Sequence, residues 1–441
     1  MTAEHIEKHS HMLELFGSGI VTSILLIILV RKVRPSFISP VYGLVFVYLG
    51  VFILGGLFYD PDYGMPGMYM SEEETIRVMS QIFWVVSAFM TGAVLFATIS
   101  KRRAQLRRPI NIGAVRVSQL QTACGIVISI ASIGMAVIGT GVGNLWYRRE
   151  YIVQVNQIAQ ISGNALFLPS TFALGVIAGQ HASRARLLAL AIFGVIEALT
   201  VALSTRNFAL LPIVFCIGCL LAQPKNAKFR AALAITSLLT PFAMMVPLAT
   251  RGMAEQGFST FPQIFQAMSR TNLVDQLQEV LNNVLVSVPL TIQSAMPFAE
   301  NARDYLLLNL DPTPGVWSGW YAKELRYNVY MPFNAIGDLL RVGTWVAILY
   351  YAIVGVFFAR IDARLKSASR IGPELLLLIA LAFGFIVFSL QYSLRAATRL
   401  VYYAIAIELI WRMASMVAPR VRSRLATVWL KEATLSSTEI S

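Results

Sequence analysis

The sequence predicts an all-α polytopic membrane protein, and three observations support this fold class. First, 56% of the 441 residues are hydrophobic and only 13% are charged, which is too apolar for a soluble protein of this length. Second, apolar runs of about 20 residues, the length that crosses a hydrocarbon core, recur along the chain. Third, basic residues gather at alternate ends of these runs. A chain with these properties crosses the membrane many times.

We predict about eleven transmembrane helices. They cover residues 12–30, 40–58, 78–99, 118–140, 161–180, 186–203, 207–222, 231–249, 334–358, 372–390 and 399–415. A cleaved signal peptide would carry basic residues before its apolar stretch. The first span has the opposite order, because Glu4, Glu7 and Glu14 outweigh Lys8 before it and Arg31 follows it. We therefore expect it to be a retained span.

Clusters of Lys and Arg follow the first, third, fifth, seventh, ninth and eleventh spans. They comprise Arg31/Lys32/Arg34, Lys101/Arg102/Arg103/Arg107/Arg108, Arg184/Arg186, Lys225/Lys228/Arg230, Arg360/Arg364/Lys366/Arg370 and Arg420/Arg422/Arg424/Lys431. The positive-inside rule places all six clusters in the cytoplasm, the N-terminus outside and the C-terminus inside. The formal net charge of +13 is then a topology signal, and no nucleic-acid partner is expected.

The pattern divides the chain into four segments. Residues 1–250 hold spans one to eight, 251–333 form a large external loop between spans eight and nine, 334–415 hold spans nine to eleven, and 416–441 form a basic cytoplasmic tail. Such a long loop is a place to look for function.

Helical spacing of apolar residues predicts two helices inside the loop. The first, over 273–284, is amphipathic and lies on the membrane surface or roofs a cavity; the second covers 299–308. Aromatic side chains crowd the end of the loop, where they either form an interfacial belt or stack on sugar rings. They are Trp317, Trp320, Tyr321, Tyr327, Tyr330 and Phe333.

A set of arginines on the outer side departs from the charge rule. Arg206 lies in the hinge Ser204-Thr-Arg-Asn207, and Arg395 and Arg399 are one helical turn apart in the connection before the last span. The others are Arg148, Arg149, Arg270, Arg303, Arg326 and Arg341. Either several of them converge on a phosphate or pyrophosphate, or they form scattered salt bridges and snorkel to the interface.

Carboxylates accompany these arginines, and each is either a general base or a counterion of an arginine. The acids of the loop region are Asp304, Glu300, Asp311, Glu324 and Asp338. Glu197 differs because it lies within span six, where an unpaired carboxylate is costly, and we expect it to hold Arg206 or another arginine. Glu408 and Arg412 have the i, i+4 spacing of a structural pair.

The sequence gives little support for a metal site or for a reactive thiol pair. Asp60-Pro-Asp62 has the DxD form that can grip a divalent cation, but in its Pro- and Gly-rich turn a solvated loop is the competing interpretation. Cys216 and Cys219 lie on an apolar helix, where packing is expected. We expect no metal and no cofactor.

These features together resemble the Wzy-type O-antigen polymerases, within the wider group of oligosaccharide repeat-unit polymerases and O-antigen ligases. The resemblance rests on the many spans, the Arg206 hinge, the single long loop and the entry into span nine, Phe333-Asn-Ala-Ile-Gly-Asp-Leu-Leu-Arg-Val-Gly343. Gly337-Asp338 followed by Gly343 matches an acidic element of these families, with Asp where Glu is usual. Arg326 and Gly337 fit an arginine-x10-glycine pattern. The loop has no histidine, which favours the polymerase branch over the ligase branch.

The resemblance implies a membrane glycosyltransferase of the bacterial inner membrane, with the loop and the N-terminus in the periplasm. It would transfer a growing glycan from undecaprenyl pyrophosphate to a sugar hydroxyl of the next lipid-linked unit. Arg206, Arg326, Arg395 and Arg399 would then stabilise the departing pyrophosphate, and Asp338 or Glu324 would deprotonate the acceptor.

Further residues are expected to bind substrate: Arg303, Arg270, Tyr330 and Trp320. The lipid bilayer is a necessary partner, and a chain-length regulator and a flippase of the same pathway are candidate protein partners. Two alternatives remain open: a flippase or transporter of lipid-linked oligosaccharide, and an O-antigen ligase.

Overall fold

In the part that the computed structural model describes, the protein consists of helices joined by short connecting segments. That part comprises residues 3–33, 39–59, 71–100, 117–149, 155–180, 184–203, 207–222, 227–243, 246, 253, 255–270, 272–295, 301–313, 319–327, 334–367 and 373–413. Within these ranges β structure is limited to an isolated antiparallel bridge between Arg148 and Gln256, and no sheet is formed. The predicted all-α class is confirmed.

Eight described helices are long and apolar enough to cross a membrane, so the chain is a multi-pass membrane protein. They are Ser10–Lys32, Pro40–Phe58, Glu72–Ser100, Gln119–Thr140, Gln157–Gln180, Arg184–Ala202, Thr344–Ser367 and Glu374–Gln391. These correspond to predicted spans one to six, nine and ten. A shorter apolar helix, Leu210–Leu221, lies in predicted span seven. Helices also cover 227–243 and 394–413, in the regions of predicted spans eight and eleven.

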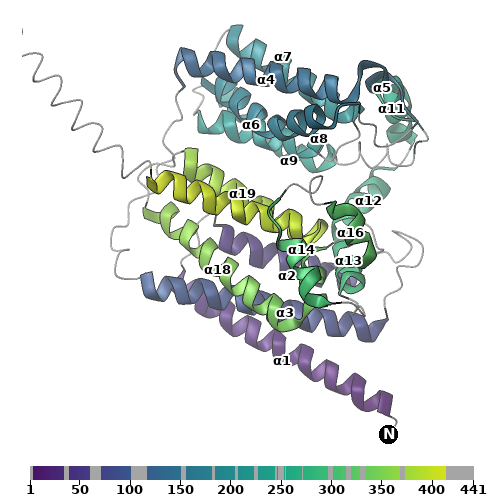
Figure 1. The fold of residues 1–441 in the computed structure, drawn as a ribbon, viewed down its shortest axis with the longest axis vertical. Helices are drawn as coiled ribbons and strands as arrows, with labels where there is room; N and C mark the ends of the chain where they lie inside the picture. Colours follow the sequence, from purple (N-terminus) through teal and green to yellow (C-terminus); the bar gives the residue numbers. More distant parts are fainter. Residues whose placement is uncertain are drawn as a thin grey trace, which may run out of the picture. The chain divides into compact units, whose positions relative to one another are not determined.

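The chain folds as two compact units, each of which has its own apolar core. The first unit combines residues 1–111 with 284–441, and the second is residues 112–283. The division therefore does not follow the four segments that hydropathy suggests along the sequence. The segments on either side of the middle third of the chain pack together, as the purple and yellow-green helices of Figure 1 illustrate within the first unit.

The first unit contains α1 (Ala3–Lys32), α2 (Pro40–Phe58), α3 (Glu72–Ser100), α13 (Ser287–Ser294), α14 (Ala302–Leu310), α16 (Trp320–Tyr327), α17 (Ala335–Val342), α18 (Thr344–Ser367), α19 (Pro373–Gln391) and the 394–413 helix. Its long helices pack through aromatic contacts in the apolar core. Phe89 of α3 meets Phe358 of α18 edge to face, with ring centroids 5.5 Å apart.

The second unit contains α4 (Gln119–Thr140), α5 (Val142–Trp146), α6 (Gln157–Gln180), α7 (Arg184–Ala202), α8 (Asn207–Leu221), α9 (Ala227–Ala243) and α11 (Phe261–Arg270). The next helix, α12 (Leu273–Leu285), crosses the boundary between the units along the sequence.

The predicted external loop is partly helical, as expected. Helix α12 confirms the amphipathic segment at 273–284, and α14 confirms the second predicted helix with a start a few residues later than expected. Helix α13, between them, is buried along its whole length. The loop region therefore contributes packed structure to the first unit.

Predicted span nine, over 334–358, is wrong in its first part. Helix α17 ends at Val342 and is capped by Gly343, whose φ of 153° suits a residue without a Cβ, and α18 begins at Thr344. At the start of α17 the Asn334 side chain accepts the N–H groups of Ile336 and Gly337 at 3.0 Å each. Asp338 therefore lies in a short capped helix before the span.

Gly337 allows α17 to lie directly against α13. A Cβ atom at this position would stand 2.4 Å from the Cβ of Ser294 and 2.7 Å from the carbonyl oxygen of Thr291. Neither distance is compatible with ordinary packing, so the close approach requires glycine. This contact fixes the position of the neighbouring residue, Asp338.

Candidate functional site

Two carboxyl groups and a tyrosine meet in the interior of the first unit. Glu324 of α16, Asp338 of α17 and Tyr305 of α14 all have 0% exposure. The Tyr305 Oη atom lies 2.8 Å from Asp338 Oδ1 and 3.1 Å from Glu324 Oε1. The sequence separates these three residues, and the packing of three short helices brings them within hydrogen-bond distance.

The remaining carboxyl oxygens accept neutral donors. The backbone N–H of Leu394, in the first turn of the 394–413 helix, donates to Asp338 Oδ2 at 2.9 Å. The side-chain amide of Asn309 donates to Glu324 Oε2 at 3.2 Å. Within the described residues neither carboxyl forms an ion pair. This arrangement differs from the arginine-bound acids that the sequence pattern suggested.

Burial changes the acidity of all three groups, which lie outside the candidate spans. Burial raises the pKa of Glu324 to about 8, and the nearby Asp338 adds to the rise. Burial also raises the pKa of Asp338 to about 6. The Leu394 N–H, the Tyr305 hydroxyl and Arg341 favour the charged form and oppose this rise. Burial and the two carboxyls raise the pKa of Tyr305 well above its ordinary value, so the phenol keeps its proton.

Arg395 and Arg399, which the sequence suggested as phosphate ligands, bind backbone carbonyls at the C-terminal end of α14. Arg395 is buried and donates to the carbonyl oxygen of Leu308 at 3.1 Å and to that of Thr313. Arg399 donates to the same Thr313 carbonyl at 2.6 Å. Tyr402 adds a bond of 2.7 Å to the Leu310 carbonyl. The 394–413 helix thereby satisfies acceptors that the end of α14 leaves open.

Asp311 and Trp320 complete the surroundings of Arg395. Asp311 forms an ion pair with Arg395 at 3.8 Å, and the guanidinium stands 5.6 Å above the ring centroid of Trp320. The backbone N–H and hydroxyl of Thr313 lower the pKa of Asp311, and Arg395 and Arg399 act in the same direction. Asp311 is therefore the counterion that one of the sequence interpretations proposed.

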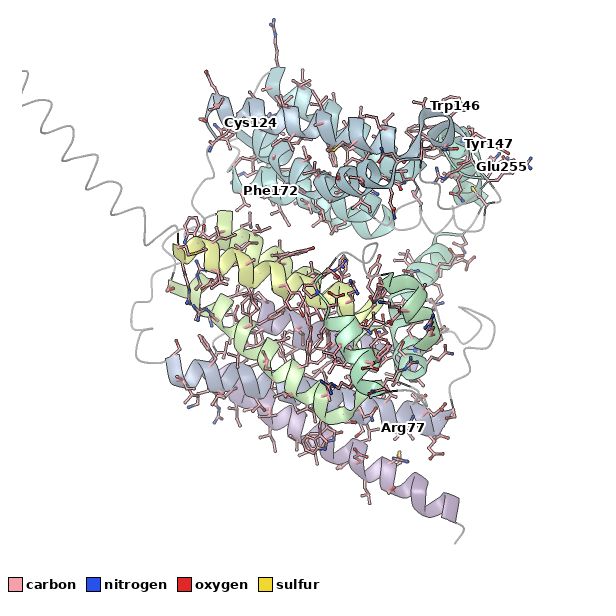
Figure 2. The ribbon with its side chains drawn as sticks, in the orientation of Figure 1. Arg77, Cys124, Trp146, Tyr147, Phe172 and Glu255 are labelled. Carbon is pink, nitrogen blue, oxygen red and sulfur yellow. The ribbon has the colours of Figure 1, made fainter. Side chains whose placement is uncertain are left out.

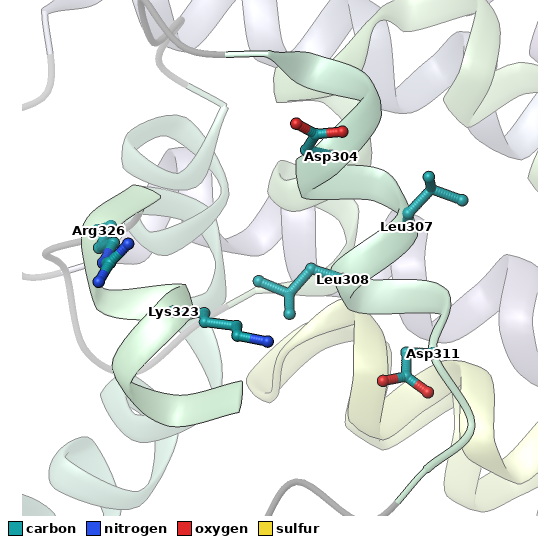
Figure 3. Close-up of a pocket in the computed structure, with 6 residues that line it drawn as sticks. All are labelled: Asp304, Leu307, Leu308, Asp311, Lys323 and Arg326. Atoms are coloured by element: carbon teal, nitrogen blue, oxygen red, sulfur yellow. The ribbon is translucent and has the colours of Figure 1, made fainter. Parts of the chain in front are cut away.

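A pocket of about 490 Å³ lies between α14 and α16. Figure 3 shows its lining, in which Lys323 extends from α16 toward α14. The lining residues are Asp304, Leu307, Leu308, Asp311, Lys323 and Arg326. Two cations on one wall thus face two carboxylates on the other, which is a suitable arrangement for a ligand with both anionic groups and hydroxyls.

The predicted site residues are only partly assembled in this way. The structure brings together Glu324 with Asp338, and Arg395 with Arg399 and Trp320, while Arg326 lines the pocket. The remaining candidates fall into two groups. Arg303 is exposed in the first turn of α14, and Arg270 ends α11 in the second unit. Arg206, Tyr330 and the Asp60/Asp62 pair lie outside the described residues.

In the second unit, Arg148 is a structural residue. It is buried and donates to the carbonyl oxygens of Ala202, at the end of α7, and Asn144 at 2.7 and 3.3 Å. Next to it, the Tyr147 hydroxyl donates to Glu255 at 2.9 Å, and Figure 2 shows these two side chains together.

The expected partner of Glu197 is not visible among the described residues. Both Glu197 carboxyl oxygens are buried there without a hydrogen-bond partner, and Arg206 lies outside those residues. Their pairing stays a prediction. The expected Glu408–Arg412 pair is confirmed at 3.1 Å.

Sequence reasoning missed Tyr305 and Asn309, which hold the acid pair from α14. A usable signal was present, because the two polar residues are four positions apart: Tyr305 lies inside the predicted helix 299–308 and Asn309 one residue beyond its end, so a helix that continued by one residue would place both on one face. Both reach Glu324. A polar i, i+4 pair on the inner face of a short helix indicates a buried polar partner.

Comparisons with known protein families, with curated proteins and with solved structures found no match to this chain.

Proposed function

We propose that the protein is a membrane glycosyltransferase that polymerises oligosaccharide repeat units linked to undecaprenyl pyrophosphate. The observation that carries the proposal is the pocket between α14 and α16, where Lys323 and Arg326 oppose Asp304 and Asp311. A lipid-linked glycan presents both a pyrophosphate and sugar hydroxyls, and these groups complement the two walls. The family resemblance of the sequence supports the same substrate class.

The proposed topology is that of a bacterial inner-membrane protein with about eleven spans. Basic clusters after every second span place the N-terminus and the pocket region in the periplasm and the C-terminus in the cytoplasm. In this orientation the pocket opens where lipid-linked repeat units are displayed.

The proposed reaction is attack of an acceptor sugar hydroxyl on the anomeric carbon of the donor glycan. The bond between that carbon and the pyrophosphate oxygen breaks, and undecaprenyl pyrophosphate leaves with the electron pair. Lys323 and Arg326 stabilise the charge that develops on the leaving group, and Arg206 retains the same role as a prediction from sequence. The proton of the acceptor passes to a carboxylate.

The choice of that carboxylate follows from exposure. Asp304 is exposed at the pocket and can contact an acceptor directly. Asp338 and Glu324, the candidates from sequence, have no exposed surface, so as bases they would require α14 or α16 to move. We therefore assign the acceptor-orienting role to Asp304 in the described conformation.

A transporter of the same lipid-linked glycan is the second candidate. Buried carboxyls without an ion-pair partner are typical of proton relays in membrane transporters, and within the described residues the Glu324–Tyr305–Asp338 cluster has this character. Such a protein would couple release of a proton to movement of the lipid.

One reconstitution separates the two candidates. Purified protein in liposomes receives a synthetic undecaprenyl-pyrophosphate-linked repeat unit as sole substrate, with excess EDTA, and the products are resolved on a gel. We expect a ladder of polymer that persists in EDTA. Movement of the lipid across the bilayer without a ladder would favour the transporter, and transfer only after addition of lipid A core would favour a ligase.

A further inference from the structure

The hydrogen-bond geometry of Tyr305 requires a proton on one of the two buried acids. Its hydroxyl has one hydrogen, yet its oxygen contacts Asp338 Oδ1 at 2.8 Å and Glu324 Oε1 at 3.1 Å. The phenol donates along one contact. At the other contact a lone pair of the phenol oxygen would face a carboxylate oxygen. This is repulsive unless that carboxyl is protonated and supplies the hydrogen. One of the two acids is therefore neutral and donates to Tyr305.

The proton belongs on Glu324. Asp338 is the better anion, because it takes the shorter phenol contact and also accepts the Leu394 N–H in the first turn of a helix, where the dipole favours negative charge. Among the described residues, Glu324 accepts only the Asn309 amide besides its contact with Tyr305. The chain of bonds then runs from the Glu324 acid through the Tyr305 hydroxyl to the Asp338 carboxylate.

Among the described residues, two arginines act on these three side chains. Arg341 of α17 stands 5.6 Å from the centroid of the Tyr305 ring and favours both carboxylates, and Arg395 of the 394–413 helix interacts with Glu324 at longer range. Helix α13, which packs against α17, contributes no titratable residue. Helix α16 itself carries Lys323 and Arg326 on its exposed side.

The protonated acid also joins α16 to α14. Tyr305 and Asn309, one turn apart on α14, both bond Glu324, a buried residue of α16 that lies between the exposed Lys323 and Arg326. If Glu324 lost its proton, a second buried negative charge would face Asp338, and the phenol could satisfy only one of them. Separation of α16 from α14, the two walls of the pocket, would relieve this unfavourable energy.

We propose that a single proton, held by Glu324 and shared through Tyr305 with Asp338, fixes α16 against α14 and thereby positions Lys323 and Arg326 for an anionic substrate. Glu324, Tyr305 and Asp338 are therefore positioning residues. The inference deepens the proposed function and rests on it for the identity of the substrate, but the proton itself follows from the geometry.

The first experiment detects the proton without any activity. Difference infrared spectroscopy of the purified protein at neutral pH compares the wild type with Glu324→Gln, and with Glu279→Gln as a matched control at an exposed acid of α12. We expect a carbonyl band of a protonated carboxyl that disappears in Glu324→Gln and persists in Glu279→Gln. If no band depends on Glu324, the proposal is overturned.

The second experiment tests the positioning role through binding. Calorimetry measures the Kd for undecaprenyl pyrophosphate in detergent as a function of pH. In the wild type the Kd rises about tenfold per pH unit once Glu324 ionises, because only the protonated form is competent. Glu324→Gln, which cannot ionise, keeps a low Kd through alkaline pH. The same rise in Glu324→Gln would contradict the proposal.

A second variant covers a failure of Glu324→Gln to fold. Tyr305→Phe retains both acids and removes the shared hydroxyl, so the pH at which the Kd begins to rise should change. An unchanged pH would count against the proton shared through Tyr305. If the band and the pH-dependent Kd are present but no polymer forms in the reconstituted assay, the proposed function fails and the positioning role stands.

Discussion

Two buried acid sites of the first unit differ in how they are neutralised. Glu408 receives three arginines: Arg360 at 2.9 Å, Arg412 at 3.1 Å, and Arg364. Glu324 and Asp338 receive no arginine within the described residues and share a tyrosine instead. The comparison shows that a buried carboxyl can be stabilised in two ways, because its neighbours decide whether the cost of burial is offset by a counter-charge or by a bound proton.

The largest expected effect is at Glu408. Glu408→Gln leaves three arginines close together without their common carboxylate, and because these arginines are partly exposed we expect a loss of about 2 kcal/mol in unfolding free energy. Thermal unfolding in detergent measures it, with Glu279→Gln as the exposed control. Unchanged stability in Glu408→Gln would show that the arginine cluster does not stabilise the fold and would remove the contrast.

A similar loss is expected at Gly337, which positions only the tyrosine-bridged site. The Cβ of Gly337→Ala would collide with the backbone of α13, so we expect a cost of about 1–2 kcal/mol and displacement of Asp338 from Tyr305. The Glu324-dependent infrared band should shift in this variant, while cross-linking between positions 360 and 408 should not change. A variant with native stability and an unshifted band would mean that α17 can move without disturbing the acids.

The pH dependence of stability gives the third prediction. The pKa of Glu324 is raised from 4.5 to about 8 in the folded protein, so between these values the unfolded chain loses a proton that the folded chain keeps. Stability therefore falls as pH rises through this window and levels off above about 8. Asp338, with a pKa near 6, adds to the fall only in its lower part.

Glu324→Gln removes the Glu324 contribution. Its melting temperature should decline less than that of the wild type between pH 6 and pH 8. Parallel pH profiles of wild type and variant would place the proton elsewhere.

The smallest effect on stability is expected in the pocket. Arg326 is exposed and lines the α14–α16 pocket, so Arg326→Ala should leave the melting temperature within error of the wild type. The affinity for undecaprenyl pyrophosphate should fall about tenfold, since a charge-assisted bond contributes roughly 1.5 kcal/mol. Arg77→Ala, on α3, is the matched control. Equal affinity in both variants would remove Arg326 from substrate binding.

Hydropathy and charge were sufficient for the main features of the fold. Helix-length apolar runs predicted the spans, since crossing a hydrocarbon layer demands length and composition before any packing. Helical spacing also predicted α12 and α14. The break at Gly343 was missed, because α17 and α18 are both apolar and a hydropathy pattern has no signal for a single backbone angle.

The candidate site was predictable in its residue types and only partly in its roles. Asp338, Glu324 and Arg326 were identified as candidates from sequence. Arg395 and Arg399 were expected to bind phosphate. In the structure their guanidinium groups bind the carbonyl groups of Leu308 and Thr313, and the phosphate role stays a prediction. A guanidinium can donate to carbonyl oxygens as well as to phosphate oxygens, so its partner depends on what the fold places within reach.

The sequence by itself determined that this is a multi-pass helical membrane protein, with charged side chains gathered between the apolar runs. Those properties follow from local composition and periodicity. Only the tertiary structure decided that Tyr305, and not an arginine, lies between Glu324 and Asp338. The reason is physical: whether a carboxyl carries a charge or a proton depends on the donors within about 3 Å of its oxygens, and these come from helices that are distant in the sequence.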